Sequence, residues 1–123
     1  MQRILIVEDE DEIRMGLTFF FEASGYCCTE AVNGYDALKV IEKESPDLII
    51  SDIMMPVLDG YEFLKIIKSR EATRSIPFII LSAKTETEEI EKGYTLGISG
   101  FLAKPFSLSE LNKLVERYLI KYT

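Results

Sequence analysis

The sequence predicts an α/β fold, a three-layer sandwich in which a five-stranded parallel sheet lies between two layers of helices. Short apolar runs typical of strands alternate with longer segments whose apolar residues recur at helical spacing. No hairpin signal joins two of these runs, and strands separated by helices are connected as parallel crossovers. With 123 residues and 47% hydrophobic composition, we expect one domain, residues 1–123, with a substantial core.

Apolar runs mark the strands, because strands buried on both faces of a parallel sheet read as continuous aliphatic stretches. The runs are Ile4–Val7, Tyr26–Ala31, Leu48–Ile50, Phe78–Leu81 and Gly100–Ala103. The first, third and fourth runs are the most aliphatic and are expected in the centre of the sheet. The second and fifth are more polar or shorter and are expected at its edges. This pattern predicts the strand order 2-1-3-4-5, with a topological switch beside the first strand.

The first three helices are indicated by apolar stripes bounded by stop and start signals. The first helix ends at Gly25, the second follows Gly34 and is closed by Pro46, and the third begins near Gly60. The residues expected on the buried faces of these helices are Ile13, Leu17, Phe20, Phe21, Ala37, Leu38, Ile41, Phe63, Leu64 and Ile67.

The last two helices differ in the strength of their signals. The fourth, from Thr87 to Leu96, has few apolar residues and contains Gly93, so we expect a marginal element. The fifth begins at a capping box formed by Ser107 and Glu110. Its expected buried face consists of Leu111, Leu114, Val115, Tyr118 and Leu119.

Charge and composition exclude several classes of function. Acidic residues outnumber basic ones 21 to 14, and the net charge of −7 argues against direct nucleic-acid binding. No apolar run approaches the roughly 18 residues needed to span a bilayer, so we expect a cytoplasmic protein without a membrane segment. Histidine is absent and the only cysteines, Cys27 and Cys28, are adjacent, so any metal is expected to be a hard ion bound by oxygen.

Polar side chains follow the strands at the edge of the sheet where a ligand is expected. Glu8 and Asp9 follow the first strand, Asp52 the third, Ser82 the fourth and Lys104 the fifth. In an open parallel sheet, ligands bind beyond the carboxyl ends of the strands near the switch point. Because these four strand ends are neighbours in the predicted order, three carboxylates, a hydroxyl and an ammonium are expected at one site.

The three carboxylates need a positive partner. At about 5 Å and an effective dielectric of about 20, each pair of like charges costs roughly 3 kcal/mol. Lys104 offsets part of this repulsion, and the rest favours Mg²⁺, which binds one or two carboxylates together with water and phosphate oxygens. A carboxylate beside Mg²⁺ can attack phosphorus to form an acyl phosphate, with Lys104 and Ser82 stabilising the phosphoryl oxygens.

Four ordered motifs carry a family resemblance: the run from Ile4 to Glu10, Asp52-Ile53-Met54-Met55-Pro56 with Asp59-Gly60 after it, Ser82-Ala83, and Lys104-Pro105-Phe106. Ser82 lies 30 residues after Asp52, and Lys104 lies 22 residues after Ser82. Together these motifs resemble the receiver domain of two-component response regulators. The resemblance covers the chain from Arg3 to the last helix, and it implies a flavodoxin-like fold.

The resemblance also implies a phosphorylation site. Asp52 would be the phosphoacceptor, in a domain that assists its own phosphorylation and dephosphorylation but is not otherwise an enzyme. Glu8, Asp9 and Asp52 would hold Mg²⁺ together with the backbone carbonyl of Met54. The phosphoryl donor would be a histidine kinase or a histidine phosphotransfer protein.

Further residues are implied to transmit the signal. Ser82 and Lys104 would contact the phosphoryl group, and a cis peptide bond would join Lys104 to Pro105. Ser82 and Phe101 would act as the switch residues, and the fourth helix, fifth strand and fifth helix would form the output face. That face would act on a downstream output domain or target protein, and it is also a candidate homodimer interface.

Three other functions are compatible with parts of the sequence. Asp9-Glu10-Asp11 weakly resembles the motif of a Mg²⁺-dependent phosphohydrolase with Asp9 as nucleophile, although the threonine that follows in that motif is missing. A flavodoxin-like cofactor binder is disfavoured, because four acidic residues stand where a phosphate-binding loop belongs. A receiver-like binding module that works without phosphorylation is the third alternative.

Overall fold

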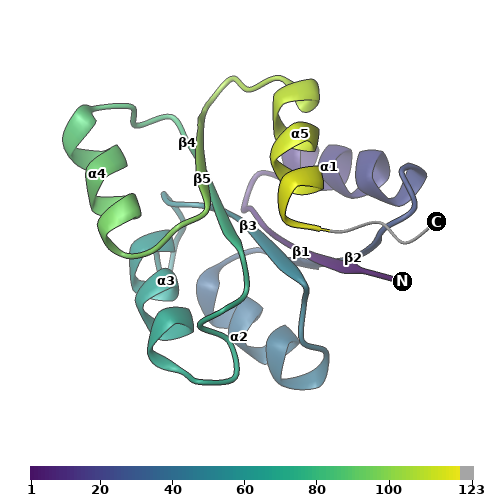
Figure 1. Cartoon of the computed structure of the whole chain (residues 1–123), viewed down its shortest axis with the longest axis horizontal. Coiled ribbons are helices and arrows are strands. Elements are labelled where there is room, and N and C mark those ends of the chain that lie inside the picture. The colour runs from purple at the N-terminus through teal and green to yellow at the C-terminus, as the bar shows by residue number, and fades with distance from the viewer. Residues whose placement is uncertain (120–123) are drawn as a thin grey trace.

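The computed structural model describes residues 1–119, in which five strands alternate with five helices (Figure 1). The elements are β1 (Arg3–Val7), α1 (Asp11–Ala23), β2 (Cys27–Ala31), α2 (Gly34–Lys43), β3 (Leu48–Asp52), α3 (Gly60–Ser69), β4 (Phe78–Ser82), α4 (Thr87–Thr95), β5 (Gly100–Ala103) and α5 (Leu108–Tyr118). All neighbouring strands are parallel, and their order is β2-β1-β3-β4-β5, which confirms the predicted α/β topology.

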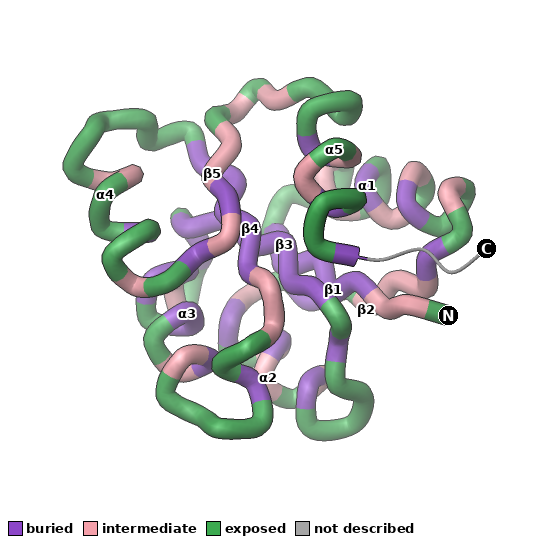
Figure 2. Tube along the Cα trace, in the orientation of Figure 1, coloured by how far each residue is buried: buried purple, intermediate pink, exposed green. Residues whose placement is uncertain are grey.

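Helices cover both faces of the sheet, as Figure 1 shows. Helices α1 and α5 pack on one face, where Leu17 and Phe21 meet Leu111 and Val115 over the inner strands. Helices α2 and α3 pack on the other face in a second apolar cluster, and α4 lies on that side as well. The inner strands β1, β3 and β4 are buried between these layers, the edge strands β2 and β5 are only partly buried, and the outer faces of the helices are exposed (Figure 2). In the described part of the chain, no helix has the length and apolar character needed to cross a membrane.

The strands differ from the predicted ranges at their ends. Strand β3 continues through Ser51 and Asp52, and β4 continues through Ser82, although these residues are polar. A parallel ladder is built from backbone hydrogen bonds, so it extends past the last apolar side chain. Strand β2 begins at Cys27, one residue later than predicted, and Tyr26 is buried against Phe21 just before it.

Polar side chains cap three helices, as their sequences indicate. Asn33 accepts a hydrogen bond from the backbone N–H of Asp36 at 2.7 Å, and Asp59 accepts one from Glu62 at 2.9 Å. Ser107 accepts from the N–H groups of Ser109 and Glu110, as expected for the N-cap of α5. Helix α1 ends before Gly25, whose φ of 100° requires a residue without a β-carbon.

Helix α4 forms as predicted, but the role of its glycine is different from the expected one. Gly93 is buried, and a β-carbon at this position would lie 2.8 Å from Ile98 Cδ1. The glycine therefore lets α4 approach the segment before β5 closely, rather than only weakening the helix. Tyr94, one of the few apolar residues of α4, is largely exposed. Tyr118 of α5 is exposed, so its predicted place on the buried face is wrong; its hydroxyl instead donates to the carbonyl oxygen of Ser99.

Candidate functional site

Pairing of β1 with β3 brings the acidic residues together. Val7 lies opposite Ser51 in the parallel register. The next residues, Glu8 and Asp52, therefore lie side by side at the same end of the sheet. Glu8 and Asp52 are both buried, whereas Asp9 is exposed. Burying two carboxylates at the end of a hydrophobic sheet costs free energy unless each has a positively charged or hydrogen-bonding partner. The partners of Glu8 and Asp52 are therefore the next part of the site to identify.

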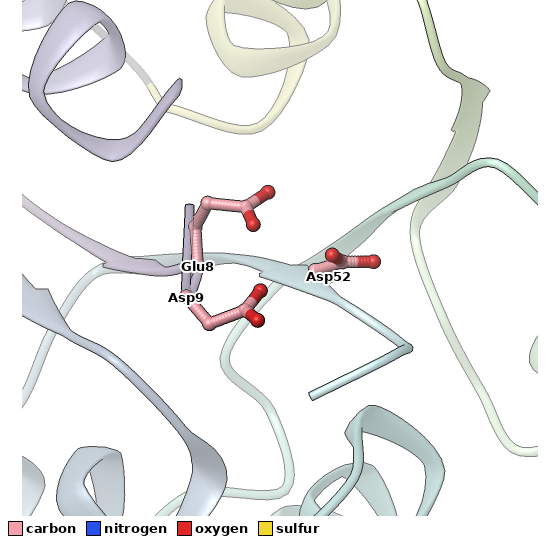
Figure 3. Close-up of side chains that lie close together, drawn as sticks. All are labelled: Glu8, Asp9 and Asp52. Atoms are coloured by element: carbon pink, nitrogen blue, oxygen red, sulfur yellow. The ribbon is translucent and has the colours of Figure 1, made fainter. Parts of the chain in front are cut away.

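Carboxylate oxygens of Glu8, Asp9 and Asp52 lie within 4.8 Å of one another. Figure 3 shows the side chains of Glu8 and Asp9 at the end of β1, with that of Asp52 beside them at the end of β3. This donor set is made only of hard oxygen atoms, and Mg²⁺ prefers such ligands. The cluster therefore fits the ion that the sequence predicts, and the structure places the three carboxylates at one point.

Lys104 joins the two buried carboxylates. Its ammonium donates to Glu8 Oε1 at 2.7 Å and to Asp52 Oδ2 at 3.0 Å. The lysine follows β5 and is fixed to β4 by a backbone hydrogen bond from its N–H to the carbonyl oxygen of Ser82 at 2.8 Å. A cis peptide bond joins it to Pro105, as the resemblance implies. The predicted convergence of the first, third and fifth strand ends is thus present.

Burial and pairing act in opposite directions on the charged groups. Burial raises the pKa of Glu8, and the hydrogen bonds from Lys104 and from the N–H of Glu10 offset only part of this effect. For Lys104, burial alone would lower the pKa, but the hydrogen bonds to Glu8 and Asp52 raise it above its ordinary value. Lys104 is therefore a charged ammonium. Burial makes the ionised form of Glu8 unfavourable, so a bound cation would stabilise the ionised carboxylate.

The backbone after β3 also binds Asp52. Its Oδ1 atom accepts hydrogen bonds from the N–H groups of Ile53 at 2.7 Å and Met54 at 3.2 Å. Together with the contact of Oδ2 with Lys104, these bonds hold the carboxylate in one orientation. The side chain of Met54 is half exposed, and the role of its carbonyl as a metal ligand stays a prediction.

The other two residues expected at the site lie on β4 and β5. Asp52 is paired with Leu81, so Ser82 follows one position further on the neighbouring strand, with its hydroxyl accepting a hydrogen bond from Lys84 N at 3.0 Å. Phe101 is opposite Ile80 on β5 and is partly buried against the cluster beneath α3. The roles of both residues as switch residues stay predictions.

A cleft of about 530 Å³ opens beside Asp9 and contains residues that the sequence patterns do not reveal. Tyr61 of α3 donates its hydroxyl to the carbonyl oxygen of Glu89 at 2.9 Å and to Glu89 Oε2 at 2.7 Å, and Lys92 Nζ lies 4.1 Å from the centre of the tyrosine ring. These three residues join α3 to α4 and line the cleft. No local spacing signals a contact across 28 residues, so only the fold reveals it.

Comparisons with known proteins agree with this geometry. The sequence model of the response regulator receiver domain matches residues 4–116, nearly the whole chain. The chain belongs to the response regulator receiver family. It is 38% identical over 118 residues to sporulation initiation phosphotransferase F of Bacillus subtilis, covering 96% of the chain and 94% of that protein. The resemblance stated from the motifs is therefore confirmed.

A curated relative and a solved structure extend this comparison. The probable transcriptional regulator ycf29 of Porphyra purpurea is 35% identical over 118 residues, which cover 96% of this receiver but only 56% of the relative. The chain thus spans about half the length of some relatives that it matches. The crystal structure of chemotaxis protein CheY4 of Vibrio cholerae superposes with a TM-score of 0.90 at 34% identity, covering 97% of the receiver and 99% of CheY4. The fold is that of CheY-like receiver domains, and members of the family interact with histidine kinases and output domains.

Proposed function

We propose that this receiver accepts a phosphoryl group on Asp52 from a histidine kinase or a histidine phosphotransfer protein, in a reaction that depends on Mg²⁺. The observation that carries the proposal is the contact of Lys104 with both Glu8 Oε1 and Asp52 Oδ2, within a cluster of three carboxylates. Phosphoryl transfer to a carboxylate needs a fixed nucleophile and positive charge near the phosphoryl oxygens. The phosphotransferase named among the relatives supports the same reaction class.

The residues of the chain would divide this work between them. An oxygen of Asp52 forms a bond to phosphorus while the phosphorus–nitrogen bond of the donor's phosphohistidine breaks, and the electron pair of that bond stays on the imidazole. Lys104 would neutralise negative charge on the phosphoryl group. In the described residues Ser82 Oγ only accepts, from Lys84 N, so its hydrogen is available for a phosphoryl oxygen.

The acidic cluster would hold the metal. Glu8, Asp9 and Asp52 would each contribute a carboxylate oxygen, and the backbone carbonyl of Met54 would be a further ligand. When bound, Mg²⁺ would supply positive charge that stabilises the transferred phosphoryl group. The exposure of Asp9 and the neighbouring cleft leave this side of the cluster open to a donor.

The phosphoryl group would then act as a signal rather than as a step of substrate turnover. It adds about −1.5 to −2 charges beside Lys104 and Ser82. Ser82 would move toward the phosphoryl group, Phe101 would turn inward, and the face formed by α4, β5 and α5 would repack. This face would act on an output domain or a target protein, or form a homodimer, and we place the protein in the cytoplasm without direct contact to nucleic acid.

Intact-mass measurement after incubation with acetyl phosphate and Mg²⁺ tests the proposal. The wild-type chain is expected to gain one phosphoryl group, and Asp52→Asn is expected to gain none. Asp59→Asn is the matched control, because Asp59 caps α3 in the loop after Asp52 and asparagine is an equally good cap, so labelling should continue. Equal labelling of the wild type and Asp52→Asn would contradict the proposal.

Two further measurements, one of which adds the variant Asp9→Asn, test the phosphohydrolase and the binding module that works without phosphorylation. Turnover of phosphomonoesters that is lost in Asp9→Asn but kept in Asp52→Asn would identify a phosphohydrolase with Asp9 as nucleophile. A wild-type chain that binds Mg²⁺ and is never labelled, by acetyl phosphate or by a phosphorylated kinase, would identify a binding module that works without phosphorylation.

A further inference from the structure

Arg14 of α1 reaches back to the loop that carries the acidic residues. Its guanidinium donates to the backbone carbonyl oxygen of Glu8 at 2.9 Å, to Asp11 Oδ1 at 2.6 Å and to Glu30 Oε1 at 2.9 Å. The arginine side chain is only 12% exposed. Three segments, the end of β1, the start of α1 and the end of β2, are therefore joined by one planar group with several fixed donors.

The contact with Glu8 is the informative one. The carbonyl of Glu8 belongs to the peptide bond that leads into Asp9, and the atoms of a peptide bond lie in one plane. Fixing the direction of this carbonyl therefore fixes where the α-carbon of Asp9 lies relative to the end of β1. The N–H of Glu8 is held as well, by the carbonyl oxygen of Ala31 at 3.0 Å, so both backbone groups of Glu8 are tied.

Asp9 depends on this support more than the other two acids do. Glu8 and Asp52 are buried, and each is bound directly by Lys104. Asp9 is exposed, and no side-chain hydrogen bond of Asp9 is found among residues 1–119. Its place in the cluster is thus set by the backbone on which it stands, and Arg14 holds that backbone from the side of α1 and β2.

Arg14 and Lys104 form ion pairs with different acidic residues. Lys104 pairs with the buried carboxylates of the cluster, whereas Arg14 pairs with Asp11 and Glu30, which lie outside it. The partners of Arg14 are themselves 76% and 37% exposed, and such surface ion pairs contribute little to stability. The two ion pairs also do not account for the hydrogen bond from Arg14 to the carbonyl oxygen of Glu8.

We propose that Arg14 is a positioning residue that holds Asp9 in place for Mg²⁺ binding, an inference that rests on the proposed function. A positioning role and a purely electrostatic role of Arg14 predict opposite changes in Mg²⁺ affinity when the residue is replaced. Removing a positive charge near the cluster would by itself strengthen the binding of a cation. Releasing the loop would weaken it, and loss of a residue that orients metal ligands typically costs about 10-fold or more in metal affinity.

Titration of the whole chain with Mg²⁺, followed by calorimetry or by amide chemical shifts, separates these effects. Arg14→Lys keeps the charge and loses the planar set of donors, so Mg²⁺ affinity is expected to fall about 10-fold. Arg14→Met keeps an unbranched stem and loses the charge, and its affinity is expected to fall as well, by a smaller factor. Glu30→Gln removes one partner of Arg14 and leaves the bond to Glu8, so affinity should stay within about twofold of the wild type.

Arg3→Lys is the matched control for a purely structural effect. Arg3 is at the opposite end of β1 and forms an ion pair of similar length with Glu44, 2.7 Å, so this variant loses a comparable arginine pair far from the cluster. Its melting temperature, measured without metal, is expected to change as much as that of Arg14→Lys, while its Mg²⁺ affinity stays at the wild-type value.

The outcomes distinguish this inference from the function on which it rests. Wild-type Mg²⁺ binding with an unchanged affinity in Arg14→Lys would overturn the positioning role alone. Tighter binding by Arg14→Met would show that the residue acts through its charge, and it would also overturn the role. A wild-type chain that binds no Mg²⁺ would overturn the proposed magnesium dependence itself, and this inference with it.

Discussion

Helices α5 and α4 flank the same edge strand and are held in place by different means. Helix α5 buries Leu111 and Val115 completely, and Leu119 follows them into the same apolar cluster. Ser107 caps its first turn with two backbone hydrogen bonds. Burial of these aliphatic side chains and capping of the first turn both stabilise α5. Their contributions add, so the helix is held firmly against the sheet.

Helix α4 has almost none of these supports. Gly93 is its only buried residue, and no side-chain hydrogen bond caps its N-terminus at Glu86. Its polar contacts with α3 are those of the Tyr61 hydroxyl with two oxygens of Glu89 and of Lys92 with the tyrosine ring. A helix held by a few polar contacts and one close approach can change position at small cost, so α4 is the part of the proposed output face that is suited to move.

Leu111→Ala should have the largest effect, because it removes apolar contacts that fix α5. The residue is fully buried, and substitutions of this kind lower the free energy of unfolding by about 2–5 kcal/mol. Urea unfolding followed by circular dichroism measures the loss. Leu108→Ala is the control on the same helix, since Leu108 is 42% exposed, and its cost should stay below about 1 kcal/mol. Equal costs at both positions would contradict the burial account of α5.

Gly93→Ala should have the next largest effect, because it disturbs the close approach of α4. The added β-carbon would lie 2.8 Å from Ile98 Cδ1 and 3.3 Å from Ile80 Cδ1, both in buried side chains. Overpacking of this kind costs about 1–3 kcal/mol, which outweighs or cancels the roughly 1 kcal/mol that alanine gains in a helix. The free energy of unfolding is expected to fall by about 1 kcal/mol.

Gly16→Ala in α1 is the matched control for that prediction. A β-carbon at Gly16 would meet nothing within 4 Å, so only the helix propensity changes and stability should rise by up to about 1 kcal/mol. The double variant with Ile98→Val, which deletes the contacting Cδ1 atom, should recover part of the loss at Gly93. Stabilisation of α4 by Gly93→Ala to the same extent as by Gly16→Ala would show that the close approach is unimportant.

The contrast between α5 and α4 also shows which parts of the structure could be predicted from the sequence. Helix α5 and the central strands follow from aliphatic periodicity and a capping residue, which are local and additive signals. The site was predictable as well, because Glu8, Asp52 and Lys104 stand at or directly after the ends of strands whose order follows from their apolar content. Parallel pairing then places them at one edge without any further information.

The contacts that the sequence does not reveal are those between separate elements. Gly93 reads as a weak point of a helix, and only the packing against Ile98 shows why a small residue is needed there. The spacing of Asp11 and Arg14 indicates one ion pair on a helix, but the bond from Arg14 to the carbonyl of Glu8 depends on how the loop folds back. Such contacts have no periodic signature, because they depend on tertiary geometry.

Tyr61→Phe should have the smallest effect on stability and the most specific one. It deletes the hydroxyl that holds Glu89 and leaves the ring in place, so a loss of about 0.5 kcal/mol, at the lower end for a hydrogen bond, is expected, together with faster hydrogen exchange of the α4 amides. Tyr94→Phe changes an exposed tyrosine of α4 itself and should alter neither quantity. Unchanged exchange in Tyr61→Phe would show that another contact holds α4.

The pH dependence of this difference separates the hydroxyl from the ring. Burial, followed by the hydrogen bond to Glu89, raises the pKa of Tyr61 well above its ordinary value near 10. The folded state therefore favours the protonated hydroxyl, and the stabilisation is complete below pH 10 and decreases as pH rises toward the folded pKa. Because phenylalanine does not titrate, the stability difference between the wild type and Tyr61→Phe should shrink above about pH 10. A difference that stays constant through this range would mean that folding does not raise the pKa of Tyr61.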